Sequence, residues 1–233
     1  MVNPLDSPIF ASPVNELRKI LLETQYIPPA EYFALMWRAE SIYLEREEHY
    51  VKRSYRNRAY IAGANGRLRL SVPLKQGKNE QMPIDEVEIA YSDESWYSNH
   101  WNSIQSAYGK APFFIYFADE VKSILFDKYR YLWDLNMAFI DFFHSKFDIP
   151  GNIEQTDQYL HKPEEIVDLR EALHPRNENR IRIKLPEYRQ IFQERHGFMH
   201  KLGALDLLFC TGPEAGYYLE GADIDLTDSS GLH

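Results

Sequence analysis

The sequence predicts an α/β fold that consists of one compact domain with a central, mostly parallel sheet. The domain opens with a short apolar run, a Pro28-Pro29 turn, a helical stretch and a second short apolar run. This order is typical of the first unit of a parallel sheet. Over residues 17–219 we find no long linker, internal repeat or low-complexity segment, so we assign this whole range to a single domain.

The two ends of the chain differ from this domain in composition. Residues 1–16 contain three prolines and little periodicity, so we expect a loose N-terminal arm. Residues 222–233 are polar and acidic, so we expect a disordered acidic tail at the C-terminus. Both segments are left out of the predicted domain.

Apolar runs and turn residues predict the elements of the opening unit. Residues 17–22 are expected to form a short buried strand, and Pro28-Pro29 the turn after it. Residues 31–39 have the apolar content and spacing of a helix, and residues 42–44 follow as the second strand.

A hairpin is the clearest local prediction. Residues 58–62 and 68–74 flank Asn65-Gly66, a dipeptide suited to the positive φ angles of a tight turn. Apolar residues alternate with polar ones along the second arm, so one face of the hairpin is apolar and the other is cationic. A further strand is expected at residues 86–89.

The middle of the chain is predicted to be helical, because apolar residues recur at helical spacing over residues 95–108, 114–126 and 131–147. Shorter elements are expected after it. They are strands at 152–154 and 181–185, a short helix from Pro163 that ends before Pro175, and helices at 187–195 and 202–209.

Composition excludes several classes of partner. The 26 Lys and Arg residues against 35 Asp and Glu give a net charge of −9, which disfavours generic nucleic-acid binding and docking on anionic membranes. A single cysteine excludes an internal disulfide and a cysteine-based zinc site. No apolar run approaches the roughly 18 residues that span a bilayer, and the N-terminus does not have the pattern of a secretory signal. We therefore expect a cytoplasmic protein.

The charge is distributed unevenly along the chain. Residues 49–79 contain no Asp or Glu but eight cations: Lys52, Arg53, Arg56, Arg58, Arg67, Arg69, Lys75 and Lys78. These cations either bind a phosphate or carboxylate group or pair with carboxylates such as Glu23, Glu45, Glu47 and Glu48. We favour pairing or solvent exposure for Arg67, Lys75 and Lys78. We favour anion binding for Lys52, Arg53, Asn57 and Arg58, because they lie where a loop meets a strand.

Other candidate residues give weaker signals. His100 has the residue type of a general acid/base, although spacing alone favours a half-buried histidine that is bonded to the backbone. Thr211-Gly212-Pro213 is predicted to be a turn whose amides could meet an anion, and Cys210 is more consistent with packing than with nucleophilic catalysis. The sequence has no dinucleotide-binding, P-loop or nucleophile-elbow motif. His196 and His200 are separated by a helix-breaking glycine, so no metal site is expected.

Several segments together resemble the WbqC-like family, whose bacterial members often lie in O-antigen and other surface-polysaccharide gene clusters. The resemblance covers roughly residues 17–219. It rests on residues 22–33, Lys52-Arg-Ser-Tyr-Arg-Asn-Arg58, Leu70-Ser-Val-Pro-Leu74, Val87-Glu-Ile89, Trp96, His100-Trp101, Tyr108, Pro112, Leu135-Asn136 and the closing 205–213. The chain departs from the family pattern at Leu22-Glu23-Thr24, where the family usually has His-Gln-Pro.

The resemblance implies a role near glycan assembly, and it strengthens the case for Lys52, Asn57, Arg58 and His100. We expect a transferase-class enzyme of surface-glycan or O-antigen biosynthesis that acts on a small anionic substrate, either phosphorylated or nucleotide-activated. Its candidate catalytic residues are His100 and Lys52, and its candidate substrate-binding residues are Tyr26, Arg53, Asn57, Arg58, Thr211, Gly212 and Pro213. No cofactor, metal, nucleic acid or membrane insertion is expected.

The alternative is a non-catalytic binding or scaffolding protein of polysaccharide assembly. Leu22 stands where relatives have the motif histidine, which favours this alternative. The 16 Tyr and 13 Phe residues also favour it, because exposed aromatic side chains are enriched at interfaces. Convergence of Tyr26, Lys52, Asn57, Arg58 and His100 on one concave pocket would instead favour an enzyme.

Overall fold

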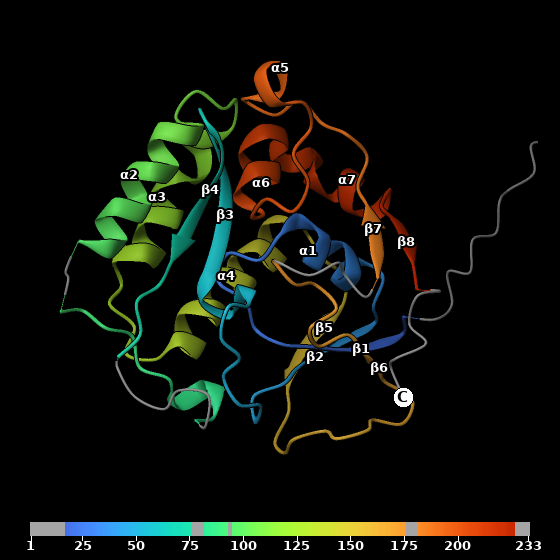
Figure 1. The fold of residues 1–233 in the computed structure, drawn as a ribbon. Helices are drawn as coiled ribbons and strands as arrows, with labels where there is room; N and C mark the ends of the chain where they lie inside the picture. Colours follow the sequence, from blue (N-terminus) through green and yellow to red (C-terminus); the bar gives the residue numbers. More distant parts are fainter. Residues whose placement is uncertain (1–16, 76–81, 93–94, 176–180, 227–233) are drawn as a thin grey trace, which may run out of the picture.

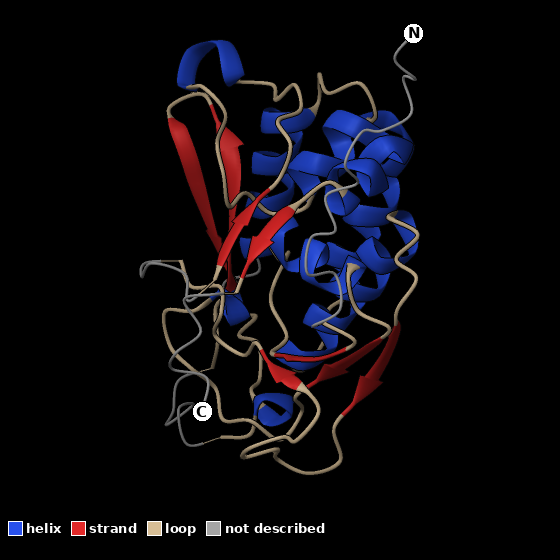
Figure 2. Cartoon of the chain, turned by 90° about the vertical axis from the view of Figure 1, so that its right-hand side faces the viewer, coloured by secondary structure: helices blue, strands red, loops and turns tan. Residues whose placement is uncertain are grey.

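The computed structural model describes residues 17–75, 82–92, 95–175 and 181–226. Its centre is a parallel four-stranded sheet with the strand order β5-β2-β1-β6 (Figure 1). The strands are β1 (Lys19–Leu22), β2 (Ser41–Leu44), β5 (Asn152–Gln155) and β6 (Val167–Asp168). Helices gather on one side of this sheet (Figures 1 and 2). The predicted α/β class and the parallel sheet are confirmed.

The opening unit forms because its segments are apolar on every side. In β1, Ile20, Leu21 and Leu22 are all buried, as expected for a central strand of a parallel sheet. Helix α1 (Ala30–Trp37) follows Pro29 and buries seven of its eight residues. It leads into β2, which pairs with β1 from Lys19↔Ser41 to Leu22↔Leu44.

The hairpin β3 (Arg58–Gly63) and β4 (Gly66–Ser71) is a separate two-stranded antiparallel sheet. It lies between the pair α2–α3 and helix α6 (Figure 1). Only Gly66 of the Asn65-Gly66 dipeptide adopts a positive φ, of 103°. The turn therefore needs the glycine, while Asn65 keeps a conformation that most residues can adopt.

The other helices are α2 (Trp96–Tyr108), α3 (Phe114–Phe126), α4 (Leu132–Lys146), α5 (Gln193–His196), α6 (Leu205–Thr211) and α7 (Ala215–Glu220). The bounds of α2, α3 and α4 match the predicted helices to within a residue or two. Among the described residues, no helix combines the length and the apolar character needed to cross a bilayer.

Four predicted elements are wrong. Residues 86–89 form only isolated bridges around a 3-10 turn (Ile84–Glu86). The helix expected from Pro163 is absent, because Val167 pairs with Ile20 of the central sheet as part of β6. The helix expected over 187–195 is reduced to α5. Asp223–Asp225, assigned to a disordered tail, form β8, which pairs with β7 (Arg182–Lys184).

After α6, the predicted Thr211-Gly212-Pro213 turn lies at the start of a 3-10 turn (Gly212–Glu214) that leads into α7, a helix that was not predicted. The predicted N-terminal arm, residues 1–16, and Lys78 lie outside the described residues.

Candidate functional site

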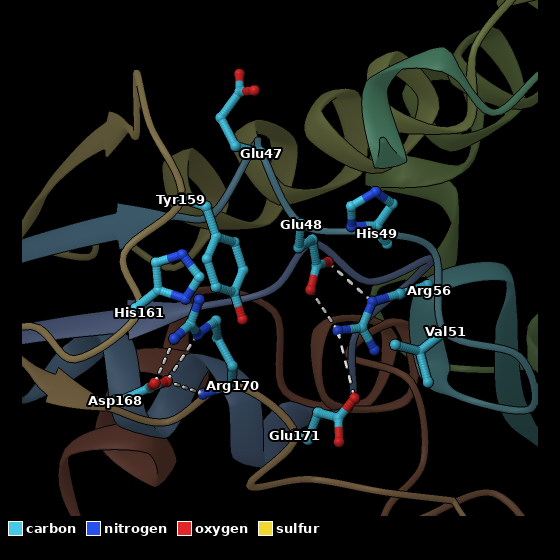
Figure 3. A pocket seen from close by; sticks show the side chains of 10 residues that line it. All are labelled: Glu47, Glu48, His49, Val51, Arg56, Tyr159, His161, Asp168, Arg170 and Glu171. Carbon is cyan, nitrogen blue, oxygen red and sulfur yellow. Dashed lines mark hydrogen bonds and ion pairs between the residues drawn. The ribbon is translucent and has the colours of Figure 1, made fainter. Parts of the chain in front are cut away.

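The carboxyl ends of the four parallel strands meet at one edge of the central sheet, and a cavity of about 740 Å³ opens there. Ligands of open parallel sheets commonly bind outside this edge, in the loops that follow the strands. The loop after β2, the segment after β5 and the residues at and after the end of β6 all contribute to this cavity. Its lining residues are Glu47, Glu48, His49, Val51, Arg56, Tyr159, His161, Asp168, Arg170 and Glu171 (Figure 3).

A buried ion pair forms one wall of the cavity. Arg56 Nε donates to Glu48 Oε1 at 2.8 Å, and Arg56 Nη2 donates to Glu48 Oε2 at 2.5 Å. Only 1% of Arg56 and 5% of Glu48 are exposed, so the pair is almost completely removed from water. Glu171 lies on the open side, with a carboxylate oxygen 3.8 Å from Arg56 Nη2 (Figure 3).

The charges of this pair influence one another. Burial raises the pKa of Glu48 to about 7, against the opposing effect of the Arg56 guanidinium. The carboxylates of Glu23 and Glu171 add to this rise. Burial alone would lower the pKa of Arg56, but the carboxylates around it raise that pKa above its usual value. Arg56 therefore stays charged, and Glu48 can exchange a proton near neutral pH.

A second group of charged side chains forms the opposite wall (Figure 3). Arg170 donates to Asp168 Oδ1 at 2.9 Å and Oδ2 at 2.5 Å, and to Glu45 Oε2 at 2.9 Å. Glu45 is fully buried and also accepts from the Thr156 hydroxyl at 2.6 Å. The Arg170 guanidinium lies 4.7 Å from the centre of the Tyr159 ring. This wall therefore presents an aromatic ring held over a neutralised guanidinium.

The lining of the cavity is acidic in total. Four residues with carboxylates, Glu47, Glu48, Asp168 and Glu171, line the cavity together with two guanidinium groups, those of Arg56 and Arg170. Ion pairs neutralise two of the four carboxylates and leave an excess of negative charge. Carboxylates and an aromatic ring in one cavity are suited to the hydroxyl groups and the apolar face of a sugar.

His100 and Tyr26 lie together, away from this cavity. The Ser71 N–H donates to His100 Nε2 at 3.2 Å, so Nε2 has no proton, and the protonated Nδ1 lies 2.8 Å from the Tyr26 hydroxyl. Burial lowers the pKa of His100 to about 4. With both ring nitrogens bonded internally, the geometry favours the structural reading of His100 over general acid/base catalysis.

The predicted anion-binding residues are spread over the loop and strand that follow Val51. Lys52 and Arg53 are exposed, and Arg53 has a positive φ of 63°. The Asn57 side chain accepts from the Tyr50 hydroxyl at 2.9 Å and donates to the Val72 carbonyl at 3.0 Å. These two bonds give Asn57 a role in joining chain segments. Arg58 begins β3 and is half-buried.

The closing turn is built around a packed glycine. The Thr211 hydroxyl donates to the Leu207 carbonyl at 2.8 Å, and Pro213 is exposed. Gly212 has a φ of 55°, and a Cβ there would lie 2.4 Å from the Phe113 ring.

Of the nine predicted site residues, Tyr26 and His100 contact each other, and none lines the carboxyl-edge cavity.

Among the eight cations, the ion-pairing alternative is confirmed for Arg56 and Lys75. Arg56 pairs with Glu48, as that alternative allowed. Lys75 lies 2.5 Å from Glu88, and Arg67 donates to the Lys201 carbonyl while it covers the Tyr60 ring. Arg56 was not among the site residues predicted from the sequence. The carboxylates that directly follow the second predicted strand were a usable signal, because carboxyl edges of parallel strands carry sites.

Within the described parts of the chain, no group of three or more His, Cys, Asp or Glu side chains is placed to hold a metal ion.

The fold and the cavity define an α/β protein with a ligand-sized, acidic site at the carboxyl edge of a parallel sheet. A family model described as the WbqC-like protein family matches residues 24–178, and the chain belongs to this family. The matched range contains every residue that lines the cavity. The chain is also 26% identical over 223 residues to the Uncharacterized protein Rv1507c of Mycobacterium tuberculosis. The aligned region covers 85% of this chain and 96% of that protein. No solved structure gives a significant match.

Proposed function

We propose that the protein is a transferase-class enzyme of surface-glycan biosynthesis that holds a phosphorylated or nucleotide-activated sugar in the carboxyl-edge cavity. The observation that carries the proposal is the buried Glu48–Arg56 pair in the wall of that cavity. A carboxyl group that titrates near pH 7 beside a ligand-sized space has the properties of a general acid/base.

In the proposed reaction Glu48 acts as the base. Its carboxylate takes the proton from an acceptor hydroxyl or amino group while that group attacks the activated carbon of the sugar. The bond to the phosphate oxygen breaks, and the phosphate group leaves with the bonding electrons. Arg56 positions the Glu48 carboxylate through two hydrogen bonds, at 2.8 Å and 2.5 Å.

The loop after Val51 supports a location for the anionic part of the substrate. Val51 lines the cavity, and Lys52 and Arg53 follow it directly on the exposed surface. In our proposal the sugar ring enters between Tyr159 and Glu171, and the phosphate group lies at the rim beside Lys52 and Arg53. The acidic interior makes this orientation more favourable than the reverse, because like charges repel in a buried space.

Thermal unfolding in the presence of nucleotide sugars and sugar 1-phosphates tests the binding step. A ligand present at a hundred times its Kd stabilises a protein by about 2.7 kcal/mol, which raises Tm by roughly 5–10 °C for a chain of this length. We expect one probe to produce this shift in the wild type and in Tyr217→Ala, but not in Tyr159→Ala. Tyr217 is a matched control, since its side chain is exposed on α7 and does not line the cavity.

Turnover of the binding probe tests the chemistry. We expect release of the nucleotide or phosphate to fall by about a hundredfold or more in Glu48→Gln, the lower end of the range for a lost general base, while binding is retained. A panel that gives no shift at all, or a shift that survives in Tyr159→Ala, would refute the proposed site. Binding without any turnover in the wild type would favour the scaffolding alternative.

A further inference from the structure

Another cavity lies between helix α2 and the β3–β4 hairpin, which are neighbours in the fold (Figure 1). Its volume is about 510 Å³, within the range of small-molecule sites. The hairpin contributes residues 62–64 and Leu68, and one face of α2 contributes a second wall. Phe192, the residue before α5, completes the lining. We call this space the α2–hairpin groove, and it shares no lining residue with the carboxyl-edge cavity.

Helix α2 presents neutral polar side chains to the groove. Asn99, Asn102, Ser103 and Ser106 all line it, and their spacing of i, i+3, i+4 and i+7 places them on one face of the helix. No residue of α2 is charged, although charged residues make up 26% of the chain. The outer faces of surface helices commonly carry charges. This face can therefore recognise a ligand through hydrogen bonds and not through ion pairs.

Several amide and hydroxyl groups of this face are free to bond a ligand. The Ser103 hydroxyl donates to the Asn99 carbonyl at 2.8 Å, and the Asn99 amide donates to the Ser95 hydroxyl at 3.2 Å. These bonds leave the Ser103 oxygen and Asn99 Oδ1 as acceptors. Asn102 and Ser106 are exposed, and their side chains have no bonding partner among the described residues. The face thus offers donors and acceptors together.

The rest of the lining is apolar. Leu68 is 43% exposed although it lies within β4, and Phe192 is half-buried. His196 Nε2 lies 3.1 Å from the Ala64 carbonyl oxygen, and this contact joins α5 to the turn of the hairpin. The contact keeps the chain that carries Phe192 beside the groove. A leucine and a phenylalanine with exposed surface can pack against the C–H groups of a ligand.

We infer that the α2–hairpin groove binds a neutral saccharide. The hydroxyl groups of a sugar ring both donate and accept, and the faces of the ring carry C–H groups, which matches a neutral polar wall beside Leu68 and Phe192. A phosphorylated or carboxylated ligand would meet no cation among the lining residues. An apolar peptide would leave the polar side chains of α2 without partners.

The groove binds its ligand without converting it. None of its lining residues is an Asp, Glu, His, Lys, Cys or Tyr, so no side chain there is suited to general acid/base catalysis. The inference therefore goes beyond the proposed function and does not depend on it.

A microarray of neutral and acidic glycans, followed by NMR titration of the 15N-labelled protein with the best neutral glycan, tests the inference. We expect at least one neutral glycan to bind and to shift the backbone amide signals of residues 62–68 and 99–107. The double variant Asn102→Ala/Ser106→Ala should raise the Kd about tenfold or more, because it removes two side chains that bond the ligand. Both positions are exposed, and alanine favours the helix, so the variant should fold.

Two matched controls locate the binding. Gln105→Ala removes an exposed amide from the same helix outside the groove, so it should leave the Kd unchanged. Tyr159→Ala alters the carboxyl-edge cavity and should also leave the Kd unchanged.

The outcomes separate this inference from the proposed function. If no neutral glycan binds, if acidic glycans are preferred, or if the double variant keeps the wild-type Kd, the groove inference is wrong. A neutral glycan whose binding is lost in Tyr159→Ala and kept in the double variant occupies the carboxyl-edge cavity. That result would overturn the groove inference and support sugar binding at the proposed site.

Discussion

Replacing Arg56 with methionine should destabilise the protein in a pH-dependent way. Arg56 is 1% exposed and is the charged partner of Glu48, which is 5% exposed. Removing one member of a buried ion pair costs about 3–5 kcal/mol, because the remaining charge is left without compensation in a poorly solvated position. For a chain of this size the loss corresponds to a Tm decrease of roughly 6–20 °C.

The sign of the pH effect follows from Glu48. Its pKa in the folded state is about 7, against an ordinary value of 4.5. A carboxyl group with a raised folded pKa contributes stability that is fully present below pH 4.5 and is lost as the pH rises through the folded pKa. Arg56→Met removes the group that lowers this pKa, so the pKa of Glu48 rises further. The difference in unfolding free energy between variant and wild type should therefore be larger at pH 8 than at pH 5, because it grows by about 1.4 kcal/mol for each pH unit above the wild-type pKa of Glu48.

Urea denaturation followed by tryptophan fluorescence measures this difference, since the chain has four Trp residues. The matched control is Arg189→Met. Arg189 and Glu194 form an ion pair with side chains 90% and 92% exposed, so its loss should change stability by less than about 0.5 kcal/mol at both pH values. The double variant Arg56→Met/Glu48→Leu should recover most of the loss, because an apolar pair replaces the charged one.

Two results would refute this reasoning. One is a loss of less than about 1 kcal/mol in Arg56→Met at pH 8, well below the range for a broken buried pair. The other is an equal loss at pH 5 and pH 8, which would show that packing and not the uncompensated Glu48 charge causes the effect.

Two further predictions concern residues outside the cavity. Burial lowers the pKa of His100 from 6.5 to about 4, so the stability of the protein should fall as the pH drops from 6.5 towards 4. His100→Gln should flatten this pH dependence, measured as the midpoint of urea denaturation. If the variant keeps the same pH dependence, groups other than His100 cause it. Gly212→Ala should cost about 2–4 kcal/mol, because it combines a φ of 55° with a Cβ 2.4 Å from the Phe113 ring. Gly66→Ala should cost only about 1 kcal/mol, since its φ is 103° but no atom lies within 4 Å of the added Cβ; equal losses would contradict the steric argument.

Local patterns were enough to predict most of the regular elements. The first strand, α1 and the second strand follow from apolar runs and the Pro28-Pro29 turn, and α2, α3 and α4 follow from helical spacing. The failures occurred where distant contacts override local preference. Residues 187–192 are not helical, because the Tyr188 hydroxyl and the Gln190 amide bond to Asp206 at 2.7 Å and 2.8 Å. These bonds involve a residue of α6 and have no local signature.

The same limit applied to the site. The sequence indicated that residues 49–79 contain cations without acidic neighbours, and it named ion pairing as one of two explanations. It could not indicate that Arg56 is the buried member, because Lys52, Arg53 and Arg56 differ little in local context. Burial of Arg56 depends on Glu48, eight residues away, and on Glu171, which arrives only through the pairing of β6 with β1.

The sequence by itself determined the α/β class, the parallel opening unit, the hairpin and the helical middle. These depend on hydrophobic periodicity and turn residues, which act over a few positions of the chain. Only the tertiary structure decided where the cavity lies and which charges line it. Parallel strands bring the ends of segments that are far apart in the chain to one edge, and a charge acts through space on whatever that edge places beside it.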